Sequence, residues 1–244
     1  MQISECPWEL ANLDCRVAEV HAQYDEHIDE RALLELELEH DYVVVKIEAG
    51  SMQNQMILSK CDYSLAETQL SIQKAKKDWK WNQDPFANKM MPLLSAERIE
   101  TEEKFAELMS KISSQMFTTD RIYLDPKFGA DYSVRRYKNW IRTEWERGSL
   151  VYKHLFRGKY VGFSLCRLVG DELKCLLAGV FEEYQNIGLG FWVPLIPEII
   201  ATVPYKSYTT QISSNNIAVY RLYNWQQFQI CKFEYVFVKH IEHK

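Results

Sequence analysis

The first candidates for chemistry are the seven residues Tyr184–Gly190 (YQNIGLG). Gly188 and Gly190 follow an apolar, strand-like run, Leu173–Phe181, and precede a segment expected to be helical. Glycine lets the backbone approach a ligand closely, and free amides at the start of a helix attract anions. The pattern Gln-x-x-Gly-x-Gly from Gln185 therefore suits a pyrophosphate group. Taken alone, an ordinary strand-to-helix turn is at least as compatible with it.

A second segment, from Ser213 to Phe228, favours a pyrophosphate-binding loop over an ordinary turn. Asn216, Leu222, Tyr223 and Phe228 fall in register with the Asn-x-x-Ala-x-x-Leu-Tyr-x-x-x-Gly-Phe pattern of the GNAT superfamily of N-acetyltransferases. The glycine loop resembles the Gln/Arg-x-x-Gly-x-Gly/Ala signature of the same superfamily, in the same order along the chain. The resemblance covers residues 149–240.

The resemblance implies an α/β (α+β) fold with a central mixed, mostly antiparallel sheet flanked by helices, and acetyl-CoA as co-substrate. One strand should end at Val180-Phe181, diverge from its neighbour and offer backbone groups to the pantetheine arm. Tyr223 aligns with the residue that protonates the leaving thiolate. The chain has 14 tyrosines, and packing in the core is the alternative role for this one. Asn216 binds the coenzyme or caps its helix. The implied cofactor-binding residues are Val180, Phe181, Gln185, Asn186, Ile187, Gly188, Leu189, Gly190 and Asn216.

The sequence departs from the family pattern behind the loop and at the end of the second segment. Val219 replaces the usual alanine, and Gln227 replaces the glycine before Phe228. Pro194 and Pro197 interrupt the segment that should form a long helix, and a proline inside a helix costs about 3 kcal/mol. We therefore expect a short or kinked helix after the loop, restarting at Pro197.

A narrower resemblance suggests the acceptor. Residues 117–140, followed by Gly162-Phe163, are similar to bacterial TDP-fucosamine acetyltransferases, two-domain enzymes that act on nucleotide-linked 4-amino-4,6-dideoxy sugars. Residues 7–18 and 58–68 resemble the first domain of that family more loosely. This implies a smaller N-terminal α/β domain with linker, residues 1–90, an acetyltransferase domain, residues 91–244, and a role in bacterial cell-surface polysaccharide biosynthesis.

Candidates for binding the acceptor follow from charge and ring chemistry. Arg121 and Tyr123 can hold a diphosphate and stack on a ring, although an ion pair between the domains is the slightly favoured interpretation. Glu182 lies where a base is needed, but a solvated carboxylate is more common there. His154 has a suitable pKa for a base, yet a lone strand histidine is more often structural or exposed.

Composition limits the remaining partners and the compartment. The net charge of −5 disfavours nucleic acid, whose partners usually carry a basic surface. The start, MQISECPWEL, lacks signal-peptide features, and the apolar run Leu189–Val203 is too short to span a bilayer, so we expect a cytoplasmic protein without membrane insertion. The six cysteines show no C-x-x-C pair and suggest buried, reduced thiols. No spaced His/Cys set predicts a metal.

Hydrophobic spacing and turn residues predict the elements that must position these residues. Strands are expected at 41–48, 62–73, 149–156, 160–169, 173–181, 207–212 and 233–238, and helices at 29–40, 51–60, 95–114, 131–147 and 216–227. Residues 74–89 read as a linker or exposed loop in which Trp79 and Trp81 anchor against the second domain. The aromatic strand at 233–238 could pair across a homodimer if it lies at a sheet edge.

Three functions are compatible with these residues and resemblances. The leading one is transfer of an acetyl group from acetyl-CoA to the amine of a nucleotide-linked amino sugar, by direct attack with Tyr223 as acid. The second is acetylation of a protein N-terminus or another small amine. The third is a non-catalytic acyl-CoA-binding or interaction module, which has no need of a proton donor at the sulfur.

Overall fold

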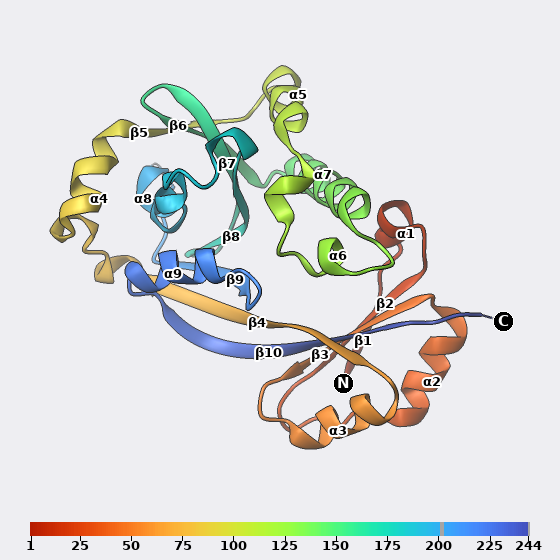
Figure 1. The fold of residues 1–244 in the computed structure, drawn as a ribbon. Helices are drawn as coiled ribbons and strands as arrows, with labels where there is room; N and C mark the ends of the chain where they lie inside the picture. The colour runs from red at the N-terminus through yellow and green to blue at the C-terminus, as the bar shows by residue number, and fades with distance from the viewer. Residues whose placement is uncertain (201–202, 244) are drawn as a thin grey trace.

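The computed structural model describes residues 1–200 and 203–243. Within these ranges the strands form one ten-stranded sheet in the order β1-β2-β3-β10-β4-β9-β8-β7-β6-β5 (Figure 1). The strands are β1 Gln2–Glu5, β2 Val17–Ala22, β3 Tyr42–Glu48, β4 Ser64–Ala75, β5 Leu94–Arg98, β6 Leu150–Phe156, β7 Lys159–Val169, β8 Glu172–Val180, β9 Ser207–Ser213 and β10 Gln229–His240. The α-helices are α1 Trp8–Leu13, α2 Glu30–Glu39, α3 Met52–Lys60, α4 Pro85–Met90, α5 Glu102–Lys111, α6 Arg121–Leu124, α7 Ala130–Glu146, α8 Ile196–Ile199 and α9 Ile217–Trp225. The 3₁₀ helices are η1 Lys76–Asp78, η2 Trp81–Gln83, η3 Met91–Leu93, η4 Ser114–Phe117, η5 Glu182–Tyr184 and η6 Leu189–Leu195.

The sheet is mixed and mostly antiparallel, as the sequence predicts. Among the described residues only the neighbours β2–β3 and β8–β9 run parallel. Helices lie over both faces, and the interior strand β3 is buried on both sides, whereas the edge strands β1 and β5 are largely exposed. The α/β fold class is thereby confirmed.

The N-terminal half of the sheet separates two apolar layers. Helices α2 and α3 lie on one face, over a core that includes Val20, Val45 and Phe237. Helices α1, α6 and α7 lie on the other face (Figure 1), where Tyr42 and Ile122 are buried. The C-terminal half has its own pair of layers, with α5 and α7 on one face and α4, η6, α8 and α9 on the other.

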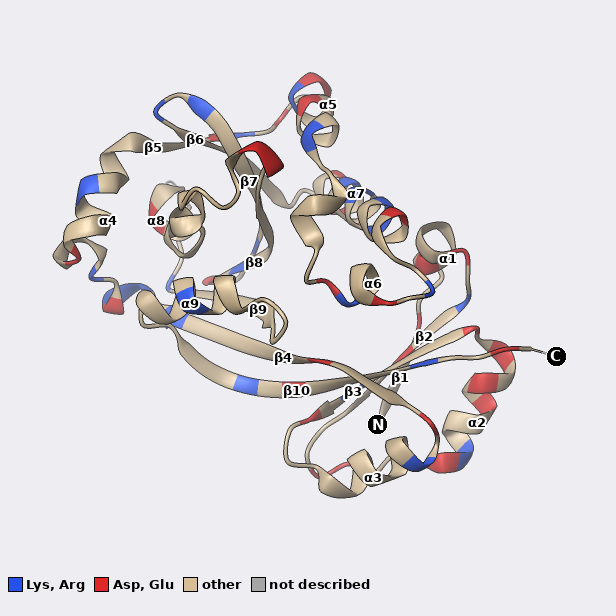
Figure 2. Ribbon diagram, in the orientation of Figure 1, with Lys and Arg blue, Asp and Glu red and all other residues tan. Residues whose placement is uncertain are grey.

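Short polar side chains begin several helices, which explains where those helices start. Asp29, Thr101 and Asp120 each accept a hydrogen bond from a backbone N–H in the first turn of α2, α5 and α6 respectively. A side-chain oxygen at this position satisfies one of the free amides at the helix start. Acidic residues lie along α2, whereas basic residues are scattered over many elements (Figure 2).

The strand β10 corrects one expectation from the sequence. It lies between β3 and β4 in the interior of the sheet, with ladders to both neighbours. The aromatic segment 233–238 is therefore not at an edge, and the expected route to a homodimer through that segment is wrong. The same strand makes the sheet continuous across residue 90, so the division into 1–90 and 91–244 stays a prediction.

Two element predictions are also corrected. Residues 94–98 form β5, which pairs with β6, so the helix expected from residue 95 starts only at Glu102. Residues 74–89 are no open linker, because β4 extends to Ala75 and η1, η2 and most of α4 follow. Trp79 packs edge-on against Phe228, and Trp81 Nε1 donates to Glu198 at 3.1 Å, so the anchoring role expected of these tryptophans is confirmed.

Candidate functional site

The parallel pair β8–β9 opens part of the way along its length. Its ladder runs from Glu172 opposite Ser207 to Cys175 opposite Thr210 and ends there. Strand β8 continues to Val180 on its β7 side alone. The backbone of residues 176–180 therefore has a strand partner on one edge only, which is the divergence that the family resemblance predicts.

A bulge determines which backbone groups face the open edge. Leu165 pairs with Leu177 and Cys166 with Cys175, so β8 carries one extra residue between the two pairs. Beyond it, the Phe181 N–H donates to the Val161 carbonyl of β7 at 3.0 Å. Since backbone groups alternate between the two edges of a strand, Val180 directs its N–H and C=O to the open edge. Of the two residues predicted to offer an amide, Phe181 uses its own within the sheet.

The glycine loop follows this open end directly. Its two turn-forming residues have left-handed backbone, with φ of 60° at Asn186 and 81° at Gly188. Ile187 is 66% exposed between them. Across residues 1–200 and 203–243, the N–H groups of Asn186, Ile187 and Gly188 have no hydrogen-bond acceptor. Three consecutive free amides in such a turn form a concavity that suits an anion.

The side chain of Gln185 fixes the loop to the strand end. Its Nε2 donates to the Val180 carbonyl at 3.0 Å and to the Gln115 carbonyl at 3.4 Å. Behind the loop, a Cβ added at Gly190 would lie 3.5 Å from Leu222 Cδ1, so the loop packs closely on α9. The side chain of Gln185 therefore has a structural role, because it connects the loop to the end of β8 and to Gln115. The free backbone amides lie in the residues that follow it.

The helix behind the loop is short, as the prolines predict. Leu189–Leu195 is a 3₁₀ segment that contains Pro194, and the single turn α8 begins one residue before Pro197. A proline has no N–H to continue the helical pattern. The missing regular helix leaves the exposed turn at 186–188 as the main source of free amides.

Tyr223 lies on the face of α9 that packs against the point where β8 and β9 diverge. It is 3% exposed, and its ring meets Phe228 edge-on at 4.8 Å between centroids. Its hydroxyl lies beside those of Tyr208 and Thr210 on β9, and Thr210 Oγ1 donates to the Cys175 carbonyl at 2.9 Å. Burial raises the pKa of Tyr223 well above its usual value, so the phenol keeps its proton at neutral pH.

Two buried thiols adjoin this hydroxyl, and sequence reasoning gave them no role. Cys166 and Cys175 face each other across β7 and β8, and both are free. The hydrogen bond with the Cys175 thiol, and secondly burial, raise the pKa of Cys166. The interpretation of these cysteines as buried, reduced thiols fits their exposures of 0% and 5%. Their place beside Tyr223 follows only from the register of β7, β8 and β9.

Asn216 is the N-cap of α9. Its Oδ1 accepts from the Val219 N–H at 3.1 Å. This is one of the two roles that the sequence left open, and it satisfies a free amide in the first turn. The capped helix begins close after β9 and carries Tyr223 two turns later.

His154 is a structural residue. It is fully buried, its Nε2 lies 2.7 Å from Ser164 Oγ, and its ring stacks on Trp192 with centroids 4.3 Å apart. Burial lowers its pKa to about 3, so the ring is neutral at physiological pH. The side chain has no path to solvent and does not serve as the base.

The segment 113–124 connects the glycine loop with the N-terminal half of the sheet. Ser113 Oγ donates to Glu182 at 3.0 Å, and a Cβ added at Gly179 would come within 2.7 Å of the Met116 methyl group. The segment then forms η4 and α6, and Ile122 is buried against β3 and β10. Glu182 itself is exposed and points to this segment, as a solvated carboxylate with one hydrogen bond.

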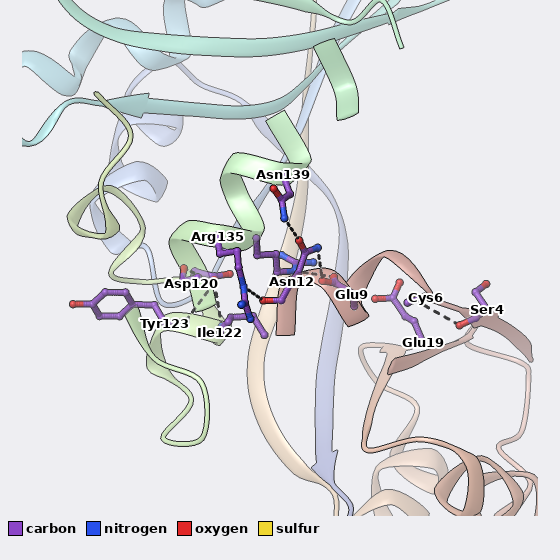
Figure 3. A network of polar contacts seen from close by, with 12 residues as sticks. Ser4, Cys6, Glu9, Asn12, Glu19, Asp120, Ile122, Tyr123, Arg135 and Asn139 are labelled. Carbon is purple, nitrogen blue, oxygen red and sulfur yellow. Dashed lines mark hydrogen bonds and ion pairs between the residues drawn. The ribbon is translucent and has the colours of Figure 1, made fainter. Parts of the chain in front are cut away.

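Arg121 and Tyr123 lie in α6, at the far end of this segment. Asp120 caps the helix and also accepts from Ser133 Oγ at 3.2 Å. Nearby, Asn12 links Glu9 of α1 to Asn139 of α7, and the Tyr123 side chain points away from this network (Figure 3). Arg121 has no ion pair among the described residues, so the favoured interpretation of an ion pair between the halves of the chain is wrong.

Two other kinds of site are absent from the described part of the chain. No group of three or more His, Cys, Asp and Glu side chains there has the arrangement of a metal site. No described helix combines the length and apolar character needed to cross a bilayer.

Comparison with known proteins identifies the fold. No family model and no curated protein matches this sequence. Among solved structures, a functionally unknown conserved protein from Staphylococcus epidermidis superposes with a TM-score of 0.60 at 10% identity, over 97% of this chain and 89% of that one. A GCN5-related N-acetyltransferase from Kribbella flavida has a TM-score of 0.56 at 10% identity, over 92% and 81%. Another from Sphaerobacter thermophilus has 0.55 at 11%, over 83% and 60%.

These likenesses concern architecture. This chain spans 60% of the length of the Sphaerobacter thermophilus protein, and the identities of 10–11% show a shared fold alone. The fold of this chain is that of the GCN5-related N-acetyltransferases, in agreement with the expectation from Gly188, Gly190 and the segment around Tyr223.

Proposed function

We propose that this protein is an acyl-CoA-dependent N-acetyltransferase that moves an acetyl group from acetyl-CoA to a primary amine. The observation that carries the proposal is the opening of β8–β9 after Cys175 and Thr210, with Tyr223 at its closed end and the exposed loop 186–188 at the other. A strand edge, an anion-binding turn and a proton donor lie in the order that an extended thioester requires. The residues present therefore fit the coenzyme.

Each part has a distinct task in this reaction. The amides of Asn186, Ile187 and Gly188 bind the pyrophosphate. The open edge of β8 aligns the pantetheine arm, and the Val180 N–H stabilises the oxygen anion that develops when the amine attacks. Removing one such donor typically raises the activation free energy by about 3 kcal/mol.

Tyr223 completes the transfer. As the new C–N bond forms and the C–S bond breaks, the departing thiolate takes the phenolic proton. A thiol has a pKa of about 8.5 and a phenol about 10, so this proton transfer is uphill by itself. The proton that the amine releases to solvent restores the phenol of Tyr223, and the sulfur is left protonated. The amine loses its proton to water, since His154 is buried and neutral.

We further propose that the acceptor is the amine of a nucleotide-linked amino-deoxy sugar, in the cytoplasm. The sequence around residues 117–140 supports this, and these residues run from the end of η4 through α6 and along most of α7. A peptide N-terminus or another small amine is the competing acceptor, and a non-catalytic acyl-CoA-binding module is the competing role.

One assay separates these roles. Coenzyme binding is measured by calorimetry, and thiol release from acetyl-CoA is followed with a TDP-4-amino-4,6-dideoxy sugar, short peptides with free N-termini, and simple amines. Turnover with the sugar nucleotide supports the full proposal. Turnover with peptides alone would identify the acceptor as a peptide N-terminus. Binding without turnover indicates the non-catalytic module. Failure to bind coenzyme A would refute the central claim.

A further inference from the structure

Arg121 is a cation without a partner in a largely enclosed position. Its Nε is buried, and none of its nitrogen atoms donates a hydrogen bond or forms an ion pair within residues 1–200 and 203–243. Burial opposes its charge, but the groups around it, Tyr42, Asp120, Glu67 and Glu19, raise its pKa. A guanidinium has five N–H donors, and the buried Nε–H of Arg121 is left without an acceptor, which is costly.

Glu67 is an unpaired carboxylate close by. It is 7% exposed and accepts a single hydrogen bond, from Gln69 Nε2 at 3.1 Å. No Lys, Arg or His of the described ranges lies within ion-pair distance of it. The charges of Glu67 and Arg121 act on each other, yet the two side chains do not form a salt bridge. A buried carboxylate without a counter-ion is uncommon unless it has a role in binding.

The sheet register places Glu67 on the face that is covered by α6, the helix that carries Arg121. Glu67 lies opposite Val236, which belongs to the apolar layer under α6. Tyr42, whose buried hydroxyl also has no hydrogen-bond partner in the described chain, lies in the same layer. This is the face covered by the segment 113–124, whose other end touches Gly179 and Gln185 at the opening of β8.

We propose that Arg121 and Glu67 are the acceptor subsite, and that the acceptor is an amine that also carries an anionic group, a carboxylate or a phosphate. Arg121 binds the anion through its planar donor fork, which suits both oxyanions. Glu67 accepts hydrogen bonds from the ammonium group and holds it until it loses its proton. This inference rests on the proposed acetyl transfer, and it adds that the amine and the anion belong to one molecule.

Kinetics with matched pairs of amines test the subsite. Each pair differs in the anion alone: an amino acid against its amide, and an amino-sugar 1-phosphate against the free amino sugar. We expect the wild type to favour one anionic member by about a hundredfold in kcat/KM, since an enclosed charge pair is worth that much. The pair that shows the preference identifies the anion as a carboxylate or a phosphate. Equal kcat/KM for both members of each pair would overturn the proposal.

Variants assign the roles. Arg121→Gln should remove the preference for the anionic member, and Arg121→Lys should retain about a tenth of it because lysine lacks the fork. Glu67→Gln should raise KM for both members of a pair alike. Arg98→Gln, at an exposed arginine remote from this face, is the matched control and should leave the preference unchanged. An unaltered preference in Arg121→Gln would exclude Arg121 as the anion receptor.

A binding measurement keeps the subsite testable if the protein acetylates nothing. Inorganic pyrophosphate is added to the protein with saturating coenzyme A, which occupies the glycine loop, and the rise in Tm is compared between wild type and Arg121→Gln. A smaller rise in the variant supports the site, and equal rises overturn it. If coenzyme A fails to bind, the proposed function fails, while the difference between wild type and variant still reports on Arg121.

Discussion

The same sheet contains a closed region and an open one. In the closed region, β10 pairs with β3 and β4 along long ladders, from Glu234 to His240 on one side and from Gln229 to Val238 on the other. In the open region, β8 and β9 share a ladder that ends at Cys175 and Thr210. The first region holds the two halves of the chain together, and the second leaves backbone groups free.

The difference comes from where the backbone N–H and C=O groups of each strand find hydrogen-bond partners. Buried N–H and C=O groups need partners, and β10 finds them on both edges. On β8 the regular pairing with β9 ends at Cys175, directly before the bulge residue Leu176. The free edge is then stable only because it is accessible to solvent or ligand. The contrast suggests that this protein binds its ligand through backbone groups in the open region and through side chains in the closed one.

The largest expected effect tests the open region. Tyr223→Phe should lower kcat by about a hundredfold to ten-thousandfold, because a positioned proton donor contributes that much. The Kd for coenzyme A should hardly change, since the hydroxyl meets the sulfur only during transfer. Tyr220→Phe, on the same helix and 40% exposed, is the matched control. An unchanged kcat in Tyr223→Phe would remove this residue from the mechanism.

The next effect tests how tightly the sheet is closed beside the opening. A Cβ at Gly162 would lie 2.2 Å from the Gly179 carbonyl oxygen and 2.7 Å from the Trp192 ring. Gly162→Ala should therefore reduce the free energy of unfolding by about 3 kcal/mol, the usual cost of overpacking. Chemical denaturation measures this. Gly158→Ala, in an open hairpin turn with φ of 76°, should cost only about 1 kcal/mol. Equal losses would contradict this contrast.

His154 provides a smaller, pH-dependent test of the closed interior. Its pKa is about 3 in the folded protein and 6.5 when exposed, so the unfolded state binds more protons between these values. Stability should fall as pH drops below 6.5, by about 1.4 kcal/mol per unit, and be fully present above it. His154→Gln keeps a hydrogen bond to Ser164 without titrating. Denaturation at several pH values should show a shallower slope in this variant.

The smallest expected effect concerns Gly188 and separates backbone strain from a role in binding coenzyme A. Gly188 and Gly170 both have positive φ, 81° and 59°, and neither Cβ would meet an atom within 4 Å. Substituting alanine should cost each variant about 1 kcal/mol of stability. Only Gly188→Ala should also weaken coenzyme A binding, by about fivefold, because the loop amides change direction. Calorimetry on both variants decides this, and a similar loss of affinity in Gly170→Ala would show that strain alone is responsible.

Local sequence patterns predicted much of the C-terminal half. The hairpin at Arg157-Gly158, the loop at Gly188, the capped helix after Asn216 and the short helix near Pro197 follow from turn residues and spacing. The predictions of a helix at residues 94–98 and of a linker at residues 74–89 were wrong. The first segment is a strand because it pairs with β6, and the second is held in place by packing of Trp79 against Phe228. Such contacts join residues far apart in the sequence and leave no local period.

The sequence by itself determined the pieces: the exposed glycine turn, the tyrosine on an amphipathic helix, and the proline that shortens the helix behind the loop. These depend on backbone freedom, capping and periodicity, which act over a few residues. Tertiary structure alone decided that β10 lies inside the sheet, that β8 leaves β9 after Cys175, and that Arg121 and Glu67 lie near each other without forming an ion pair. These depend on strand order and register, which are set by the packing of the whole chain.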